Sequence, residues 1–89
     1  MYYVYVLLSL RDKELYTGFA TNIEKRLYKH NGGLVKATKG RRPLKLIYYE
    51  ACLDKRDALH REKYLKTSWG KRYIKGRLKN YFMKMATVR

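Results

Sequence analysis

The chain contains a single cysteine, Cys52, and only two histidines among its 89 residues. One thiol cannot form an internal disulfide, and the two histidines are not spaced to complete a zinc site with it. Disulfide scaffolds and structural zinc modules are therefore excluded, and a reducing, cytoplasmic location is expected.

Long apolar segments are also absent. The most apolar stretch, residues 1–8 (MYYVYVLL), is too short to span a bilayer, contains three tyrosines and lacks the basic start of a secretory signal. We interpret it as a β-strand, and we expect no membrane partner. Pro43 is the only proline and no linker or repeat interrupts the chain, so one small domain is expected over residues 1–85, with a frayed end at residues 86–89.

Acidic residues are scarce. Seven Asp and Glu against 22 Lys and Arg give a formal net charge of +15. Such an excess favours a polyanionic partner, and nucleic acid is the first candidate. An acidic membrane surface fits less well, because the basic residues occur throughout the sequence rather than on one amphipathic helix. The hydrophobic fraction of 46% is typical of a folded domain.

The residues that are present predict three strands and three helices. Segments rich in tyrosine, valine and leucine predict strands, and the polar residues 10–14 predict a hairpin between the first two. The expected strands are residues 2–9, 14–18 and 44–51, and the expected helices are residues 21–31, 54–68 and 71–85. This β-β-α-β-α-α order predicts an α+β domain with a small, three-stranded, mainly antiparallel sheet flanked by helices.

Short polar motifs mark the expected ends of the helices. Thr21 and Glu24 form a capping box at the start of the first helix, and residues 32–33 (Gly-Gly) allow it to end in a left-handed turn. Asp54 is the expected N-cap of the second helix. Gly70 is expected to separate the second helix from the third.

An ionisable pair lies on the inward side of the second helix. At about 100° per residue, Glu62 falls within an apolar stripe and Lys66 lies beside it; the stripe is formed by Ala58, Leu59, Leu65 and Trp69. A carboxylate among apolar side chains is costly to bury unless it is paired. Two interpretations remain open: a structural Glu62–Lys66 salt bridge, or a metal ligand facing a cleft, with Lys66 as phosphate contact or structural partner.

The first helix has the same feature. Arg26 and His30 lie one turn apart, on the side where Ile23 and Leu27 should face inward. Taken singly, the histidine fits a half-buried packing role and the arginine fits a stem laid over apolar surface. Two helices with ionisable groups on their inward sides are more typical of a functional site. If both helices pack on one face of the sheet, Arg26, His30 and Glu62 should converge.

Tyrosines add hydroxyl groups to the first two strands. Tyr3 and Tyr5 share one face of the first strand, and Tyr2 points to the other. The hairpin is expected to bring Tyr16 near Tyr5. Tyrosines in strands are usually packing residues with a hydrogen-bonded tip, and this chain has ten. Spacing alone therefore leaves both a packing and a catalytic interpretation open.

The first two strands resemble the paired motifs of the GIY-YIG nucleases. Residues 4–5 (Val-Tyr) are similar to the end of the first motif, and residues 16–18 (Tyr-Thr-Gly) are similar to the second. The first motif lacks its usual glycine, and Thr17 stands where isoleucine is usual. Both tyrosines, Tyr5 and Tyr16, are present, so the departures concern the local backbone more than the chemistry.

The later motifs match the same family. Its usual arginine and histidine on the following helix match Arg26 and His30, and its metal-binding glutamate matches Glu62 within ALHREKYLK. The segment KGRRPLKLIYYE resembles the small stand-alone branch of the superfamily, which is related to the nuclease domain of the bacterial repair excinuclease. The resemblance covers roughly residues 2–82.

The resemblance implies a metal-dependent endonuclease that hydrolyses DNA phosphodiester bonds in DNA repair or recombination. It implies that Glu62 holds one divalent cation, Mg²⁺ or Mn²⁺, whose other ligands are mainly water and phosphate oxygen. It also implies that the planar guanidinium of Arg26 binds the scissile phosphate. Gly18 belongs to the structural part of the motif.

A tyrosine is implied as the general base. Tyr5 or Tyr16 would take a proton from the attacking water, and His30 would orient a tyrosine or relay a proton. A free tyrosine has a pKa of about 10, so the base needs neighbouring positive charge to ionise. The metal, Arg26 and the net charge are expected to lower that pKa.

Other basic residues are expected to follow the sugar-phosphate backbone, with salt-sensitive affinity and no sequence readout. These candidates are Lys36, Lys39, Arg41, Arg42, Lys71, Arg72 and Lys75. We expect cleavage that is structure-selective or weakly sequence-specific, or recruitment by another protein. The resemblance favours DNA over RNA.

Two alternatives remain open. A non-catalytic nucleic-acid-binding module on the same fold would bind without Mg²⁺ and without nicking. A small ribonucleoprotein component would copurify with RNA and tolerate Glu62→Ala. Neither alternative explains the inward carboxylate as well as a nuclease does.

Overall fold

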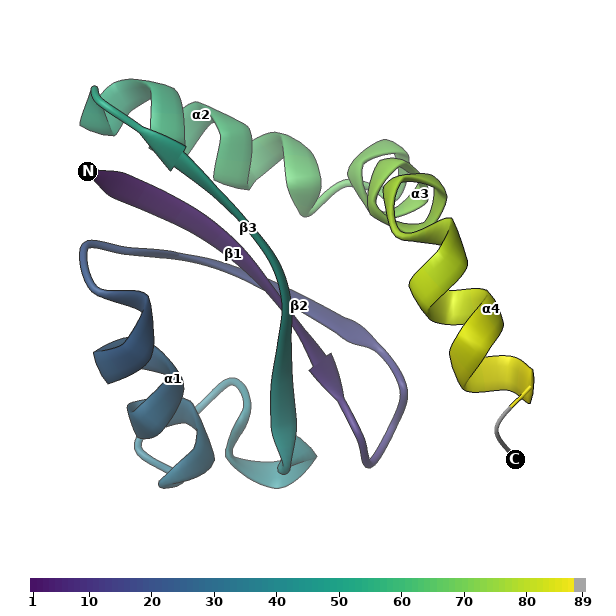
Figure 1. The fold of residues 1–89 in the computed structure, drawn as a ribbon. Coiled ribbons are helices and arrows are strands. Elements are labelled where there is room, and N and C mark those ends of the chain that lie inside the picture. The colour runs from purple at the N-terminus through teal and green to yellow at the C-terminus, as the bar shows by residue number, and fades with distance from the viewer. Residues whose placement is uncertain (88–89) are drawn as a thin grey trace.

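The computed structural model describes residues 1–87, and its three strands form one antiparallel sheet with β1 in the centre (Figure 1). The strands, in the order β2-β1-β3 across the sheet, are β1 (Tyr2–Ser9), β2 (Leu15–Ala20) and β3 (Leu44–Cys52). The helices are α1 (Ile23–Asn31), α2 (Lys55–Leu65), α3 (Ser68–Arg77) and α4 (Lys79–Thr87), with a short 3-10 turn at Lys39–Arg41. The expected α+β class is confirmed.

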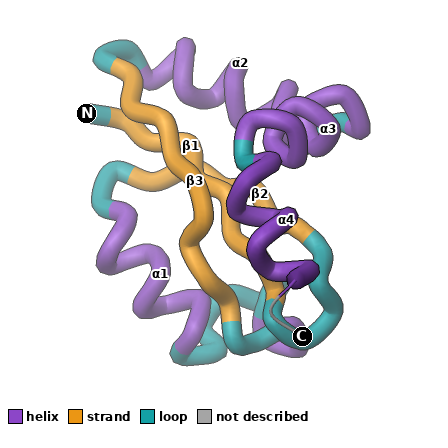
Figure 2. The backbone as a smooth tube through the Cα atoms, turned by 45° about the vertical axis from the view of Figure 1, so that its right-hand side comes forward, coloured by secondary structure: helices purple, strands orange, loops and turns teal. Residues whose placement is uncertain are grey.

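The sheet separates the helices, with α1 on one face and α2 and α3 on the other (Figures 1 and 2). Side chains of β1 alternate between the faces, so Val4 and Val6 pack against Ala58 of α2 while Tyr5 and Leu7 face the α1 side. The condition under which Arg26, His30 and Glu62 could converge, α1 and α2 on one face of the sheet, is therefore not met. The face that a helix covers depends on the path of the chain around the sheet, which the helix's own pattern does not encode.

The β1–β2 hairpin places two tyrosines on the α1 face. Tyr5 lies opposite Gly18, and Leu7 lies opposite Tyr16. Directly opposite residues of an antiparallel pair project to the same side, so Tyr5 and Tyr16 both point toward α1. The expected proximity of these two tyrosines is confirmed. Tyr2 points to the other face, as expected, and packs beside the α2 core.

The ends of α1 were predicted in part. Asn22, rather than Thr21, is the N-cap: its backbone is extended and its side-chain oxygen accepts the Lys25 N–H at 3.0 Å. Either residue type can cap a helix, so the sequence did not separate them. The left-handed C-terminal end is confirmed, because Gly33 has a φ of 77° and donates its N–H to the His30 carbonyl oxygen.

A break of two residues, 66–67, separates α2 from α3, so the expected helix through residue 68 is wrong. The hydroxyl of Thr67 accepts the Gly70 N–H at 3.1 Å and caps the start of α3. Gly70 lies inside α3 and does not end a helix. A side chain on Gly70 would overlap the Tyr64 carbonyl group, so this glycine lets α3 pack closely against the end of α2.

The early end of α2 changes which residues face inward. Asp54 caps α2, as expected, with its carboxylate accepting a backbone N–H. Ala58 and Leu65 are buried, but Leu59 and Trp69 are exposed. The expected stripe was therefore half wrong: Trp69 belongs to α3, beyond the break, and Leu59 lies on the exposed side of α2 itself.

The expected third helix is divided into α3 and α4 at Leu78 (Figure 2). Ile74 is buried in the core and Leu78 packs beside it, so this side of the segment faces the sheet. α4 extends through Thr87, and the rest of the range expected to fray, residues 88–89, lies outside the described residues. Within residues 1–87, no helix is both long enough and apolar enough to cross a membrane.

Candidate active site

The site is organised around Tyr5, which lies on the central strand and extends over the edge strand β2. Gly18 sits directly opposite Tyr5, and a Cβ at Gly18 would overlap the Tyr5 phenol. The glycine of the second motif therefore has a steric role, because it leaves room for the aromatic ring above β2. This places the hydroxyl of Tyr5 near the side chains of α1.

Four of the five predicted catalytic side chains come together on this face. The Tyr5 hydroxyl lies 2.7 Å from Nε2 of His30, in a buried hydrogen bond. The Nε–H of Arg26 donates to the same hydroxyl at 3.4 Å. The ring of Tyr16 meets the His30 ring edge-on, with 5.1 Å between centroids. Arg26 and His30 therefore face a tyrosine cluster, which accounts for their position on the inward side of α1.

His30 is fully buried and has a second partner on its other nitrogen. The Thr38 hydroxyl, also fully buried, lies 2.7 Å from Nδ1 of His30. Burial, with a smaller effect from the charge of Arg26, lowers the pKa of His30 from 6.5 to about 4. The imidazole is therefore neutral at pH 7, with one nitrogen donating and the other accepting.

The partners of His30 favour the tautomer with the proton on Nδ1. In that state Nδ1–H donates to Thr38, whose own hydroxyl points to the Val35 carbonyl oxygen at 3.5 Å. Nε2 is then free to accept the Tyr5 proton. In the opposite tautomer Tyr5 would accept from both His30 and Arg26, and its own proton would have no acceptor among residues 1–87. Nε2 is therefore poised to receive a proton from Tyr5.

Burial raises the pKa of the Tyr5 phenol above its ordinary value of 10.0. The hydrogen bond and charge of Arg26 oppose this rise, and the nearby Tyr16 and Glu62 add to it. The expectation that Arg26 lowers the pKa of the tyrosine is confirmed in direction for Tyr5, but burial outweighs this one guanidinium and the net shift is upward. Tyr5 is a neutral phenol that donates to His30.

Glu62 lies on α2, across the sheet from α1, yet it is near enough for its charge to affect Tyr5. Its carboxylate is mostly buried and accepts an ion pair from Lys66 Nζ at 3.2 Å. The structural salt bridge considered from sequence is thus present. It does not exclude the second interpretation, because Lys66 remains about half exposed and can turn toward solvent.

The carboxylate and other possible metal ligands near Glu62 can be compared with the ligands that different divalent cations require. Among the described residues no three His, Cys, Asp or Glu side chains form a cluster that could enclose a metal. Glu62 therefore offers a single carboxylate. One carboxylate does not fit a zinc or calcium cage, but it fits Mg²⁺ or Mn²⁺, which keep several waters and take further oxygens from a phosphate.

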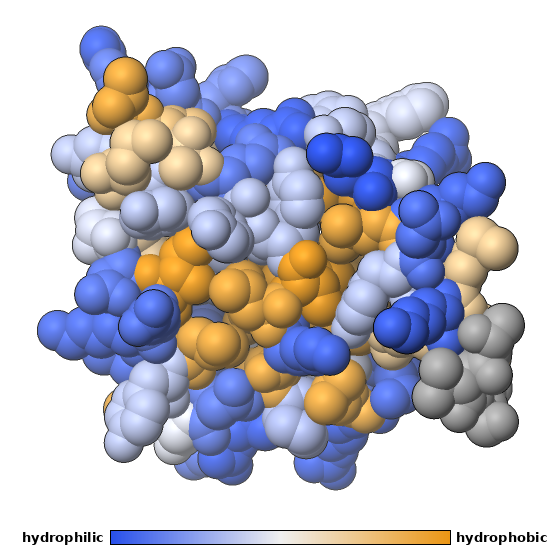
Figure 3. Space-filling model, in the orientation of Figure 1, coloured by the Kyte–Doolittle hydropathy of each residue, from blue (hydrophilic) through white to orange (hydrophobic). Residues whose placement is uncertain are grey.

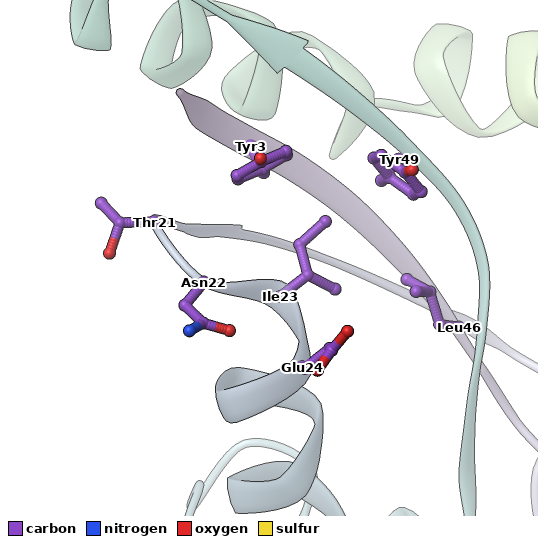
Figure 4. A pocket seen from close by; sticks show the side chains of 7 residues that line it. All are labelled: Tyr3, Thr21, Asn22, Ile23, Glu24, Leu46 and Tyr49. Carbon is purple, nitrogen blue, oxygen red and sulfur yellow. The ribbon is translucent and has the colours of Figure 1, made fainter.

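Two hollows flank the start of α1. One, of about 480 Å³, is lined by side chains of α1 and of the β1–β3 face: Tyr3, Thr21, Asn22, Ile23, Glu24, Leu46 and Tyr49 (Figure 4). It contains none of the predicted catalytic residues. The other, of about 340 Å³, is lined by Arg26, Lys25 and Lys29 together with the end of β2. This second hollow gives solvent and anions access to the Arg26 guanidinium.

The expected nucleic-acid contacts fall on two separate segments, the 36–42 turn and α3. Arg41 is largely committed elsewhere, because its guanidinium binds Asp12 at 2.7 Å and holds the pKa of that carboxyl at about 2. Arg42 donates to the Lys39 carbonyl oxygen at 2.8 Å. Exposed lysines are found on both segments: Lys36, Lys39, Lys71 and Lys75. In Figure 3, hydrophilic side chains likewise surround an apolar centre on one face of the molecule.

Sequence reasoning missed two polar residues that hold the site. Thr38 orients His30 from an irregular turn, where no periodicity indicates burial. The Asn31 side chain donates to the Leu44 carbonyl oxygen at 2.9 Å and accepts the Leu44 N–H at 2.8 Å. This clamp joins the end of α1 to the start of β3, and the amide of Asn31 supplies both the donor and the acceptor that it needs.

A third missed feature is an ion pair on the α2 face. Arg61 binds Glu50 through two nitrogens, with Nε and Nη2 each 2.9 Å from a carboxylate oxygen. The Tyr48 hydroxyl donates to the same carboxylate at 2.8 Å. Side chains alternate along β3, so Tyr48 and Glu50 lie on one face. This spacing is the feature of the sequence from which their contact could have been predicted. These contacts join β3 to α2, the helix that carries Glu62.

Comparison with known proteins agrees with this arrangement. A family profile described as the GIY-YIG catalytic domain matches residues 1–75. A UPF0213 protein of Clostridium perfringens is 49% identical over 67 residues, covering 74% of this chain and 71% of that protein. A UPF0213 protein of Staphylococcus saprophyticus is 48% identical, covering 74% and 80%.

A solved structure gives the same result. The solution NMR structure of a UPF0213 protein from Bacillus halodurans superposes with a TM-score of 0.51 at 33% sequence identity, and the match covers 83% of this chain and 82% of that one. The family profile spans both tyrosine motifs and the segment that carries Glu62. The chain therefore belongs to the GIY-YIG family, in its small stand-alone branch together with the UPF0213 proteins.

Proposed function

We propose that the chain is a metal-dependent endonuclease that hydrolyses DNA phosphodiester bonds with structure selectivity or weak sequence preference. The observation that carries this proposal is the buried hydrogen bond between the Tyr5 hydroxyl and Nε2 of His30, with Arg26 beside it. A packing tyrosine needs only one hydrogen-bond partner. A proton acceptor behind the tyrosine and a phosphate-binding group beside it serve hydrolysis. A role in DNA repair or recombination rests on the resemblance to the nuclease domain of the bacterial repair excinuclease.

The proton path runs through Tyr5 to His30. As water attacks phosphorus, its proton goes to the Tyr5 oxygen while the Tyr5 proton goes to Nε2 of His30. The P–O bond to the leaving oxygen breaks, that oxygen takes a proton from solvent water, and His30 returns its proton through Tyr5 to solvent. Because Tyr5 gains one proton and gives up another together, its raised pKa does not oppose the reaction, and no free phenolate forms.

Substrate binding strengthens this base. The charge of Arg26 is one of the two causes that lower the pKa of His30. A phosphate bound to Arg26 offsets that charge, so the pKa of His30 rises when the substrate is in place. The hollow lined by Lys25, Arg26 and Lys29 is the route by which the phosphate reaches the guanidinium. Thr38 keeps the imidazole in the tautomer that accepts the proton.

Glu62 is the residue that would hold Mg²⁺ or Mn²⁺, which when bound supplies charge neutralisation at the scissile phosphate. Lys66 would release the carboxylate for this role and stay nearby as a phosphate contact. Since Lys66 pairs with Glu62 at 3.2 Å and is about half exposed, its side chain can move without disturbing the core.

The test is cleavage of labelled single-stranded, duplex, flapped and branched DNA with Mg²⁺ or Mn²⁺, and with a chelator. Glu62→Gln keeps the side-chain shape and removes the charge, and we expect it to reduce cleavage at least about a hundredfold without reducing binding. Glu14→Gln, in the exposed β1–β2 turn, is the matched control and should cleave like the wild type. Equal binding by all three proteins with no cutting on any substrate would instead favour a non-catalytic nucleic-acid-binding module.

A further inference from the structure

Exposed aromatic rings gather where α2 meets α3. Trp69, the chain's single tryptophan, is 66% exposed, and Tyr64 and Tyr73 are partly exposed nearby in the chain. A guanidinium covers each ring: Arg72 lies 4.9 Å from the Trp69 centroid, and Arg61 lies 5.4 Å from that of Tyr64 and 4.9 Å from that of Tyr73. An exposed tryptophan outside the core is a candidate for recognition rather than folding.

The local backbone holds Trp69 in this exposed position. The Thr67 hydroxyl donates to the Tyr64 carbonyl oxygen at 2.7 Å and accepts the Gly70 N–H at 3.1 Å. The missing side chain at Gly70 brings α3 against the end of α2, and Ile74 anchors α3 in the core. Trp69 therefore projects from a capped and anchored helix, so its exposure is a fixed feature of the fold.

Charge identifies the class of partner. Every charged residue after Glu62 is Lys or Arg, so this C-terminal segment repels cations and attracts a polyanion. Arg72 lies over one face of the Trp69 ring, and the Trp69 side chain is 66% exposed. Lys71 and Lys75 on the same helix are exposed beside it. A flat open ring with cations around it matches a nucleobase with its flanking phosphates.

We propose that Trp69, backed by Arg72, is a stacking site for an unpaired base of a single-stranded DNA segment. Bases inside a duplex already stack on both faces, so an open indole ring selects bases that are unpaired. Trp69 is seven residues after Glu62, and its Cα lies at most about 17 Å from that of Glu62. The unpaired base would therefore bind on the Glu62 side of the site, a short length of strand away from the phosphate being cut. This inference deepens the proposed function by naming a single strand, or a junction with one, as the substrate class.

The tryptophan fluorescence of the protein reports on Trp69 alone, since no other residue of the chain is a tryptophan. Oligothymidine titrated in the presence of chelator should quench the tryptophan fluorescence. A duplex whose two ends are closed by non-nucleotide linkers has no unpaired base and should not quench it. Trp69→Ala should weaken oligothymidine binding about tenfold or more, measured by anisotropy of labelled DNA. Its affinity for the closed duplex should stay within about twofold.

Two further variants distinguish the loss of base stacking from a nonspecific effect of removing an exposed aromatic side chain. Trp69→Phe keeps an aromatic ring and should bind oligothymidine more tightly than Trp69→Ala. Tyr28→Ala removes an aromatic side chain on α1 that is even more exposed, and it should have no effect. The proposal is overturned by absence of quenching, or by equal loss of affinity for single-stranded and closed duplex DNA. Because no cleavage is needed, an inactive protein that still shows selective quenching would refute the nuclease and retain the stacking site.

Discussion

Acidification should destabilise the fold through one buried histidine. His30 is fully buried with a pKa of about 4, against 6.5 for an ordinary histidine. As the pH falls, the unfolded chain binds this proton first, so the stabilisation is complete above pH 6.5 and is lost progressively down to about pH 4. Linkage then gives a loss of about 2 kcal/mol in the free energy of unfolding between pH 7 and pH 5, and about 3 kcal/mol by pH 4.

The second histidine provides the control. His60 is exposed on α2, so His60→Gln should retain the pH dependence, whereas His30→Gln should lose that part of it. Urea unfolding at pH 5, 6 and 7 measures the slope, which is informative even if His30→Gln is less stable at every pH. NMR titration of the wild type gives the pKa of His30 without a variant. If His30 titrates near 6.5, or if the slope survives in His30→Gln, the assignment of His30 as a buried neutral base is refuted.

Two further substitutions test the packing and hydrogen bonds of the site. Gly18→Ala places a methyl group in the space of the Tyr5 phenol. It should destabilise the protein by about 1–3 kcal/mol in chemical denaturation and reduce cleavage. Unchanged stability would show that Tyr5 is not held over β2. Thr38→Val leaves Nδ1 of His30 without a partner; it should cost about 1–3 kcal/mol and change the ¹⁵N shifts of the His30 imidazole. Thr38→Ser should restore both, and failure to do so would assign Thr38 a packing role only.

Local patterns predicted the parts of the site that lie on regular elements. Strand alternation put Tyr5 and Tyr16 on one face, and helical spacing put Arg26 and His30 on one side of α1. Both follow from the fixed periods of strands and helices. The same rules place residues on a face of an element but do not say against what that face packs, so the position of α2 across the sheet was not predicted.

The parts that were missed depend on non-local contacts. Gly70 was interpreted as a helix breaker, whereas it is a point of close approach between α2 and α3. Thr38 lies in an irregular turn, and its role exists only because the fold brings that turn to His30. The raised pKa of Tyr5 likewise results from burial in the assembled fold, which the net charge of the sequence could not indicate.

The Asn31–Leu44 clamp leaves the exposed position Gly40 free to change, while Thr38 and Arg41 on either side of it stay bound to His30 and Asp12. Its two hydrogen bonds fix both ends of residues 32–43, so the length of the intervening loop does not set the position of α1 against β3. Because loop closure costs only about 0.6 kcal/mol per doubling of length, insertions near Gly40, where an added Cβ meets no neighbour within 4 Å, should be tolerated. Growth of the loop at this position would change the molecular surface near Tyr5 and His30 while the clamp keeps α1 in place against β3.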